Sequence, residues 1–231
     1  MSLAWLEPFA SVTDIYLGRR LAVVARAGQA STLVRYAPTL PLERVLDLLH
    51  QGAAAQLDER QALRVRLGAA FCPPVCFPVP RRITRWRELH AWARQSAADA
   101  LDTDPAQLMV DSDRLHHGLA AALPRAVHDA LQTWAVSHRL AIRSLCPLWS
   151  DATRCGQARR ARELWVLEPD GLVRLPAASC EPADAPLPSL LEALPPASKF
   201  TALVFSPQRA ARRCTKGPSF LAMHWEAAHA P

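Results

Sequence analysis

Short strand patterns alternate with helical patterns along this chain, and that order limits the folds it can adopt. Residues 19–28 and 31–38 read as two strands joined by a short turn, which is typical of a β-hairpin. Residues 41–56 follow with apolar side chains at helical spacing, and residues 63–67 then alternate apolar side chains with arginines, as strands do. Strands and helices in this alternation indicate an α/β fold with mixed sheets and flanking helices.

The alternation continues through the middle of the chain. A helix is expected over residues 84–101 with Thr84 as its N-cap, and residues 106–113 read as a short strand. A second long helix is expected over residues 118–139, although Pro124 inside the pattern indicates that the helix could begin near that residue. Residues 140–149 read as another strand.

A polar and charged stretch, residues 150–163, interrupts the alternation and is expected to form a linker or an exposed loop. Two short strands are expected within residues 164–177, because the Pro169-Asp170-Gly171 sequence between them favours a hairpin turn. Residues 180–196 are rich in proline and allow at most a short helix. Residues 199–207 read as a further strand, and residues 217–231 could add a last one.

The elements after the linker repeat, in shortened form, the order of those before it. We therefore expect two unequal subdomains, with residues 1–150 forming the larger one and residues 151–231 forming a smaller, abbreviated one. The chain has 231 residues, of which half are hydrophobic, so it can bury a sizeable core.

The charge of the chain is basic but dispersed. The formal net charge is +6, and nearly all basic residues are arginines that are interspersed with acidic residues. A surface that binds nucleic acid uses a clustered basic patch, so we expect no specific nucleic-acid partner. A basic nucleic-acid-binding protein is kept as an alternative on charge alone.

No segment of the sequence reads as a secretory signal or a membrane anchor. The N-terminal residues lack a basic segment followed by an apolar one, and no stretch reaches 18 apolar residues. We therefore expect a cytoplasmic protein with no transmembrane segment, and peripheral attachment to the inner membrane stays open. The six cysteines are expected to be free thiols in a reducing compartment.

Cys72 and Cys76 lie in the proline-rich segment FCPPVCFPVP. Zinc sites use two cysteine pairs at closer spacing, and redox pairs lie at a helix N-terminus, which Pro73 and Pro74 do not allow here. The prolines instead favour a kinked, edge-like strand. We interpret both cysteines as small hydrophobic side chains at the end of a buried strand.

Other groupings of potential metal ligands are weaker. His116 and His117 follow Asp111 and Asp113, but capping of the next helix by Asp113 or Ser112 explains the same pattern. The chain also lacks the glycine-rich phosphate loops and the nucleophile motif of hydrolases. We therefore expect no catalytic residue, no cofactor and no metal.

Asp14 and Gly18 give the one indication of a nucleotide, because they resemble in outline the acidic, glycine-bearing first hairpin of actin-like ATPases. Trp86, Trp92 and Trp134 lie on apolar helical faces and are expected in the core. The arginine-rich residues 81–87 are interpreted as solvated surface, with docking of an acidic partner as the alternative.

Residues 61–150 resemble a known family in the order of their elements. The strand LRVRL leads to the apolar segment FPVP, and the helix WRELHAWA with its early Glu88 follows. A later helix, ALPRAVHDALQTWAVSHRL, precedes the strand AIRSLCP, which ends at Pro147. This order resembles the cytoplasmic actin-like domains of bacterial assembly platforms, namely the M-protein of type IV pili and the L-protein of type II secretion.

The resemblance implies an actin-like (RNase H-like) fold and a non-catalytic scaffold that docks on protein partners of an inner-membrane assembly complex. The M-protein is similar to ATP-binding actin relatives and keeps glycine-rich phosphate loops, whereas the L-protein has lost such loops, and this chain has none. A nucleotide-binding actin-like ATPase is therefore the nearest alternative. An unrelated small enzyme is a further one.

Overall fold

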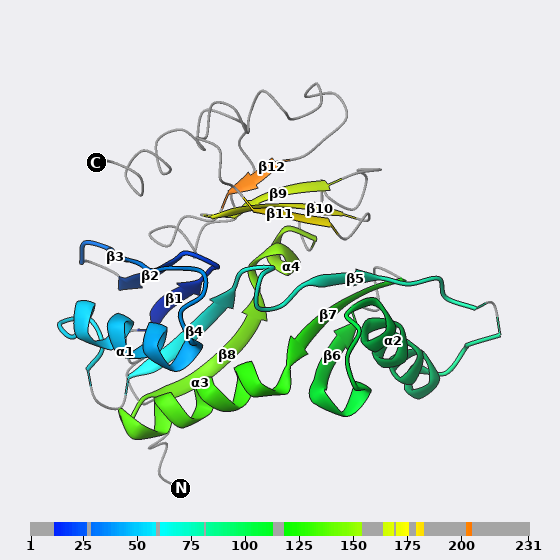
Figure 1. Ribbon diagram of the computed structural model, residues 1–231, viewed down its shortest axis with the longest axis horizontal. Helices are drawn as coiled ribbons and strands as arrows, with labels where there is room; N and C mark the ends of the chain where they lie inside the picture. Colours follow the sequence, from blue (N-terminus) through cyan, green and yellow to red (C-terminus); the bar gives the residue numbers. More distant parts are fainter. Residues whose placement is uncertain are drawn as a thin grey trace, which may run out of the picture.

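Three β-sheets organise the part of the chain that the structure describes (Figure 1). The structure is a computed structural model. It describes residues 12–26, 29–58, 61–80, 82–112, 118–153, 164–168, 170–175, 179–182 and 202–204. We call the five-stranded sheet A, the three-stranded sheet B and the four-stranded sheet C.

Sheet A has the strand order β3-β2-β1-β4-β8. Its strands are β1 (Thr13–Leu17), β2 (Leu21–Arg26), β3 (Thr32–Arg35), β4 (Ala62–Leu67) and β8 (Ala141–Pro147). The first three form an antiparallel meander, β4 pairs in parallel with β1, and β8 pairs in parallel with β4. The predicted hairpin is confirmed as β2 and β3, and the strands predicted over residues 63–67 and 140–149 are confirmed as β4 and β8.

Strand β1 lies at the centre of sheet A, although the sequence pattern did not reveal it. All five of its residues are buried. Ile15 and Leu17 pack into the core on the helix side of the sheet, and Tyr16 packs on the opposite side with Leu21 and Val23. Because both faces of the strand are buried, its residues do not show the alternation of a half-exposed strand.

Two helices, α1 (Leu42–Gly52) and α3 (Arg125–Ser137), cover one face of sheet A (Figure 1). Their buried side chains recur at helical spacing and form the largest core with the apolar side chains of the sheet. Those side chains are Val45, Leu46 and Leu49 of α1 and Leu131, Trp134 and Ala135 of α3. Helix α1 confirms the helix predicted over residues 41–56 and ends at Gly52.

The long helix expected over residues 118–139 is wrong in its first third. Residues Leu119–Pro124 form strand β7, and α3 begins only at Arg125, as Pro124 indicated. Strand β7 is the central strand of sheet B and is almost wholly buried, so a continuous apolar run suits it. Such a run gives no polar face, and periodicity alone cannot separate it from a buried helix.

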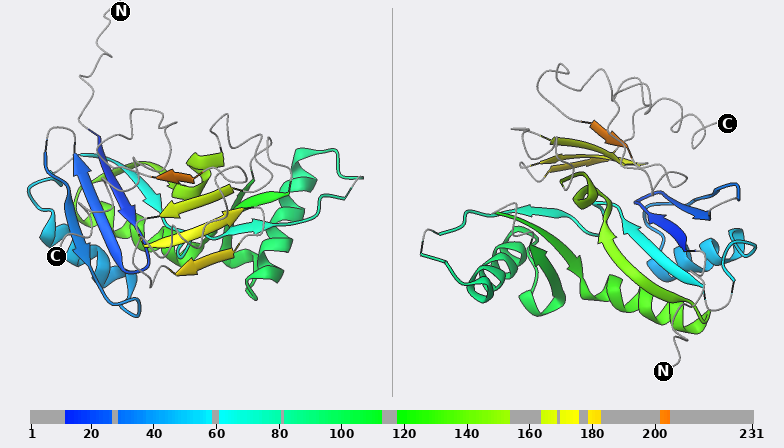
Figure 2. Two further views of the ribbon diagram at one scale, coloured as in Figure 1. Left: turned by 90° about the horizontal axis from the view of Figure 1, so that it is seen from above. Right: turned by 180° about the vertical axis from the view of Figure 1, so that it is seen from behind.

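Sheet B has the order β5-β7-β6, and both of its outer strands pair antiparallel with β7. It contains β5 (Pro74–Cys76) and β6 (Leu108–Ser112), and a short 3-10 turn, η1 (Pro105–Gln107), precedes β6. Helix α2 (Trp86–Ala100) covers one face of the sheet, and this unit lies at the end of the molecule away from α1 (Figure 2). The edge-like strand predicted for the cysteine segment is confirmed as β5.

The expected cap of helix α2 is wrong. The N-cap position is Arg85, which makes no side-chain capping hydrogen bond, so Thr84 lies one residue outside the helix. The expected helix over residues 84–101 is otherwise confirmed. Thr84 carried the better capping side chain, but the helix begins at Trp86, whose side chain is partly buried against the core of sheet B.

Sheet C has the order β11-β10-β9-β12. Its strands are β9 (Leu164–Glu168), β10 (Gly171–Leu175), β11 (Ser179–Pro182) and β12 (Ala202–Val204). The first three form an antiparallel meander, and β12 pairs in parallel with β9. Sheet C therefore repeats the pairing of β1 to β4 in sheet A, as the abbreviated order of elements predicted.

Some details of the second part differ from the expectations. The predicted hairpin around Asp170 is confirmed as β9 and β10, but β11 was not expected because its segment is rich in proline. Helix α4 (Leu148–Thr153) occupies the start of the predicted linker. The short helix expected near residues 188–196 and the strand expected over residues 217–231 lie outside the described residues.

Strand β8 forms one edge of sheet A and carries an irregularity. Leu63 of β4 pairs with Ile142, but Arg64 pairs with Ser144, so Arg143 has no partner on β4. This extra residue is a β-bulge, and the Arg143 side chain is exposed.

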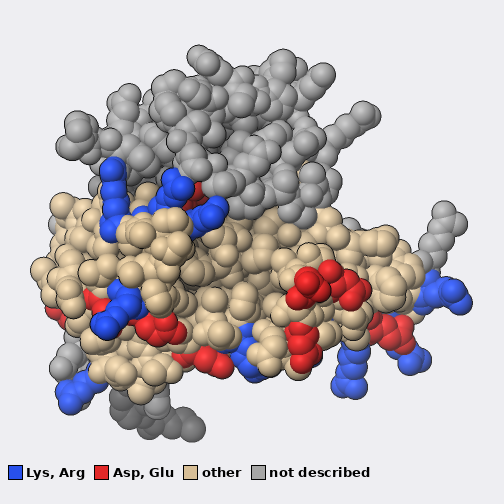
Figure 3. Space-filling view, viewed as in Figure 1, with Lys and Arg blue, Asp and Glu red and all other residues tan. Residues whose placement is uncertain are grey.

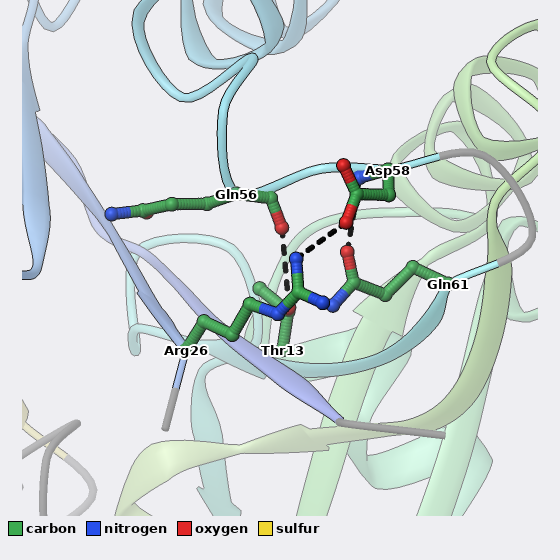
Figure 4. Close-up of polar contacts among 5 residues, drawn as sticks. All are labelled: Thr13, Arg26, Gln56, Asp58 and Gln61. Atoms are coloured by element: carbon green, nitrogen blue, oxygen red, sulfur yellow. Dashed lines mark hydrogen bonds and ion pairs between the residues drawn. The ribbon is translucent and has the colours of Figure 1, made fainter. Parts of the chain in front are cut away.

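A polar network fixes the end of sheet A at which β1 begins (Figure 4). A nitrogen of the Arg26 guanidinium lies 2.5 Å from Oδ2 of Asp58, and the backbone N–H of Asp58 donates to Oε1 of Gln61 at 3.0 Å. The Thr13 hydroxyl donates to the carbonyl of Gln56 at 3.4 Å. These bonds tie β1 and β2 to the connection between α1 and β4.

None of the helices in the described ranges is long and apolar enough to cross a membrane.

Candidate functional site

The two antiparallel meanders meet where the turn between β1 and β2 faces the turn between β9 and β10. The loop that follows β4 completes the contact. We call this contact the hairpin junction, and it consists of Tyr16, Gly18, Arg20, Gly68, Ala69, Glu168 and Asp170. Corresponding turns of sheets A and C form the two sides of the hairpin junction, so the junction is a consequence of the duplicated order of elements.

Asp170 joins the two hairpins with both of its carboxylate oxygens. The Tyr16 hydroxyl donates to Oδ1 of Asp170 at 2.7 Å, and the backbone N–H of Arg20 donates to Oδ2 at 2.7 Å. One side chain therefore holds the C-terminal end of β1 and the turn that follows it.

Glu168 makes a second link, to the loop after β4. The backbone N–H of Ala69 donates to Oε2 of Glu168 at 2.8 Å, whereas Oε1 is buried without a hydrogen-bond partner. The residue is only 2% exposed. Burial raises the pKa of Glu168 to about 8, and the charge of Asp170 adds to the rise, while the bond from Ala69 acts in the opposite direction.

Two glycines allow this close approach. A β-carbon on Gly18 would lie 2.2 Å from Oδ1 of Asp170. A β-carbon on Gly68 would lie 2.7 Å from the Tyr16 hydroxyl and 3.1 Å from Oε2 of Glu168. A side chain at either position would therefore collide with the groups that close the junction.

Two tyrosines supply neutral hydroxyl donors around Gly18. Burial, together with the charges of Glu168 and Asp170, raises the pKa of Tyr16 well above its usual value. Burial also raises the pKa of Tyr36, whose hydroxyl donates to the carbonyls of Gly18 at 2.6 Å and of Leu21 at 3.1 Å. Both phenols therefore stay protonated and keep the turn between β1 and β2 in place.

The chemistry of the junction differs from that of a phosphate cradle. Phosphate-binding turns present backbone N–H groups to the anion, and here the N–H groups of Arg20 and Ala69 already donate to carboxylates. The oxygens of Glu168 and Asp170 occupy the place that an anion would need, and the negative charge of Asp170 would repel it.

The structure separates the two residues that indicated a nucleotide. Gly18 lies in the junction, but Asp14 forms a two-point ion pair with Arg64 of β4, through Nε to Oδ1 and through Nη2 to Oδ2 at 2.6 Å. The carboxylate of Asp14 is therefore used inside sheet A.

Cys72 and Cys76 have different environments. Cys72 is buried in the core of sheet A, burial raises the pKa of its thiol, and its carbonyl accepts a hydrogen bond of 2.8 Å from the Trp149 indole. Cys76 is exposed on β5, so its expected burial is wrong. Because β5 is an edge strand, one of its side chains can face solvent.

The other candidate residues do not come together in the described ranges. No three His, Cys, Asp or Glu side chains in that part of the chain are placed to hold a metal ion. Asp111 is exposed on β6, whereas Asp113, His116 and His117 lie outside the described residues.

The expectation that three tryptophans lie in the core is confirmed only in part. Trp134 is buried and Trp86 is partly buried, but Trp92 is 39% exposed and its indole donates to the carbonyl of Pro78 at 2.8 Å. Trp92 is therefore not a core residue as expected. Arg82, Arg85 and Arg87 are exposed, in agreement with a solvated surface; residue 81 lies outside the described residues.

The sequence revealed only half of the junction. Gly18 and the Pro169-Asp170-Gly171 turn stood out, whereas Tyr16, Ala69 and Glu168 did not. The repeated order of elements could have been used to predict the junction, because it places the first hairpin of one half opposite the first hairpin of the other.

Neither a family model nor a curated protein sequence matches the chain. Solved structures match it by fold. The cytoplasmic domain of EpsL, an inner-membrane component of the type II secretion system of Vibrio cholerae, matches with a TM-score of 0.57 at 14% sequence identity. This match covers 84% of the present chain and 82% of that one.

Two further structures match less closely. The PilM-PilN type IV pilus biogenesis complex has a TM-score of 0.49 at 13% identity, and the match covers 75% of this chain and 60% of that one, which is less than two thirds. A Bacteroides thetaiotaomicron protein with an actin-like ATPase fold and unknown function has a TM-score of 0.44 at 8% identity, with 79% and 69% covered.

The likeness to the EpsL domain confirms, for the fold, the resemblance inferred from residues 61–150. The chain shares its fold with the cytoplasmic domain of EpsL, an inner-membrane component of a type II secretion system.

Proposed function

We propose that this chain is a non-catalytic scaffold domain that docks on protein partners of a bacterial type II secretion or type IV pilus-like assembly platform. Its fold, which it shares with the EpsL cytoplasmic domain, supports an assembly role. The observation that carries the non-catalytic part is the closed hairpin junction, in which Glu168 and Asp170 occupy the backbone donors of Ala69 and Arg20.

A nucleotide would have to break these bonds to place its phosphates between the two hairpins. It would also meet two carboxyl groups at the point where a phosphate-binding protein offers N–H groups. We therefore expect no ATP or ADP binding at the junction. The nucleotide-binding actin-like ATPase stays the alternative that this expectation tests.

The first experiment is a thermal unfolding titration of the full chain with magnesium-ATP and magnesium-ADP. A ligand that binds only the folded state raises the melting temperature as its concentration exceeds its Kd. We expect an unchanged melting temperature up to millimolar nucleotide, with magnesium alone as the control. A saturable rise would contradict the non-catalytic assignment and support the ATPase alternative.

The second experiment is co-purification of the tagged chain from membranes of its own host, followed by identification of the bound proteins. Recovery of inner-membrane secretion or pilus components supports the scaffold role. Recovery of nucleic acid alone, lost steeply as salt is raised, would contradict it and support the nucleic-acid alternative. The mixture of basic and acidic side chains over the face shown in Figure 3 favours the first result.

We also propose that the chain acts in the cytoplasm, peripheral to the inner membrane, and that its larger and smaller subdomains divide near residue 150. The distribution of the sheets supports this division, because sheets A and B use strands up to Pro147 and sheet C uses strands from Leu164 onward. Separate expression of residues 1–150, with a cooperative unfolding transition, would test the division.

A further inference from the structure

We propose that the hairpin junction is a proton-controlled latch, which is closed while Glu168 carries a proton and opens when Glu168 ionises. The latch concerns the movement of sheet C against sheet A, so it does not depend on which protein docks on the chain.

The geometry places Glu168 where it can control this contact. It is the last residue of β9, and its carboxyl group reaches Ala69, which lies 99 positions earlier in the chain, in the loop after β4. Asp170, two residues later, holds Tyr16 and Arg20 of the first hairpin. The two carboxyl groups together therefore bind β1, the β1–β2 turn and the loop after β4.

The surroundings of Glu168 favour its neutral form. The titratable groups that act on it, or that it acts on, are Tyr16 of β1, Asp170 of its own β9–β10 turn and Cys72 of the loop after β4. Each of these is neutral or negative, so none of them compensates a charge on Glu168. The second oxygen, Oε1, is buried without a partner, so an ionised carboxylate there would be poorly solvated.

The direction of the proton linkage follows from these surroundings. In the closed junction the pKa of Glu168 is about 8, whereas an opened, hydrated glutamate returns to its usual pKa of about 4.3. Opening between these two values therefore releases a proton. The closed state is stable at low pH, it weakens as pH rises toward 8, and it weakens no further above that value.

The hinge of this movement lies beside the junction. Trp149 of α4 packs in one apolar cluster with Val166 of β9 and Val173 of β10. This cluster holds no charge and includes Ala69, so it keeps sheet C and the Ala69 side chain packed together while the bond from the Ala69 N–H to Glu168 breaks. Opening would free the N–H groups of Ala69 and Arg20 and the space around Gly18 and Gly68.

Amide hydrogen exchange of the full chain, followed by NMR, tests the latch. The opening constant of the Ala69 amide, corrected for the intrinsic exchange rate, is expected to rise about tenfold per pH unit between about pH 5.5 and 7.5 and to level off above about 8. The amide of Val65, buried in the centre of β4, is the internal reference for global unfolding, and its opening constant should stay well below that of Ala69 at every pH.

Two variants make the test specific. Glu168→Gln is neutral at every pH and keeps an oxygen for the Ala69 N–H, so its opening constant should not change with pH. Asp170→Asn removes the neighbouring negative charge and keeps Oδ1 for Tyr16, so the levelling-off should shift to lower pH. The Asn variant also serves if Glu168→Gln does not fold.

The possible results of the exchange experiment distinguish a working latch from its absence. A tenfold rise per pH unit that disappears in Glu168→Gln, or a shifted profile in Asp170→Asn, supports the latch. An Ala69 amide that opens equally at all pH values, or a rise that persists unchanged in both variants, would overturn it. Equal opening constants at Ala69 and Val65 would indicate that Ala69 opens only by global unfolding and would likewise overturn it.

Discussion

The Tyr16 hydroxyl donates a hydrogen bond of 2.7 Å to Oδ1 of Asp170, a residue 154 positions later in the chain. Tyr16 lies in the first strand of sheet A, and Asp170 lies in the first turn of sheet C. The bond therefore joins equivalent hairpins of two similarly connected sheets. The stability of this contact should depend on a few small residues and polar groups that other parts of the chain do not replace.

A Gly18→Ala substitution should destabilise the protein by roughly 1–3 kcal/mol, because the new β-carbon would displace the Asp170 carboxylate and break its two hydrogen bonds. Urea denaturation measures the loss. In an Asp170→Ala background the atoms that the β-carbon meets are absent, so the same change should cost much less. Equal costs in both backgrounds would show that Asp170 does not fill the space above Gly18.

An Arg64→Leu substitution should destabilise the protein by about 3 kcal/mol, because it leaves the buried carboxylate of Asp14 without its ion-pair partner. Adding Asp14→Asn to the same variant removes the buried charge and should recover a large part of the loss. Chemical denaturation of the three proteins measures both steps. A double variant as unstable as Arg64→Leu would mean that the arginine acts through packing alone.

Leu131→Ala should cost about 2–5 kcal/mol, because this side chain of α3 is fully buried against sheet A and its truncation leaves a cavity. Val136→Ala on the same helix is the matched control. Val136 is 74% exposed, so its truncation should change the free energy of unfolding by less than about 0.5 kcal/mol. Urea denaturation followed by tryptophan fluorescence compares them, and similar losses would contradict the assignment of the buried face.

His50 should contribute a loss of stability as pH falls through about 6.5, the usual pKa of histidine. Burial and the neighbouring His138, on which the His50 ring stacks with centroids 3.7 Å apart, lower its pKa in the folded state, and Asp47 opposes them. A group whose pKa is lowered by folding favours the folded state only while it is neutral.

Denaturation of wild type and His50→Gln at about pH 7.5 and 5.5 checks this expectation. Glu168 contributes the opposite pH dependence over the same range, so the difference between the two proteins, rather than the wild-type curve, reports on His50. On acidification the free energy of unfolding of wild type should fall relative to that of the variant. A constant difference at both pH values would exclude the stacked histidine as the cause.

Much of the fold could be predicted because local patterns agreed with the final environment. The arginines that alternate along residues 63–67 mark a strand with two different faces, and Pro169-Asp170-Gly171 marks a turn. The predictions of secondary structure are wrong where a strand is buried on both of its faces. Strand β1 mixes polar and apolar residues that are all buried, and the apolar run of β7 looks like part of the helix that follows it.

The hairpin junction was harder to predict than the fold. Tyr16, Ala69 and Glu168 are ordinary residues in their local sequences, and only the pairing of two distant sheets gives them a common role. Capping of α2 failed for a different reason, because packing of Trp86 set the start of the helix instead of the capping preference of Thr84. Long-range packing decided both cases, and it leaves little trace in a short window of sequence.

The bulge at Arg143 has a consequence for how copies of this chain behave when they are crowded together. An edge strand offers a row of free amides and carbonyls on which another strand can grow. At β8 this row is interrupted by a residue that pairs with nothing on β4 and carries a guanidinium into solvent. A second chain could therefore add only a short, strained stretch there, and this edge resists fibril-like stacking even at high local concentration.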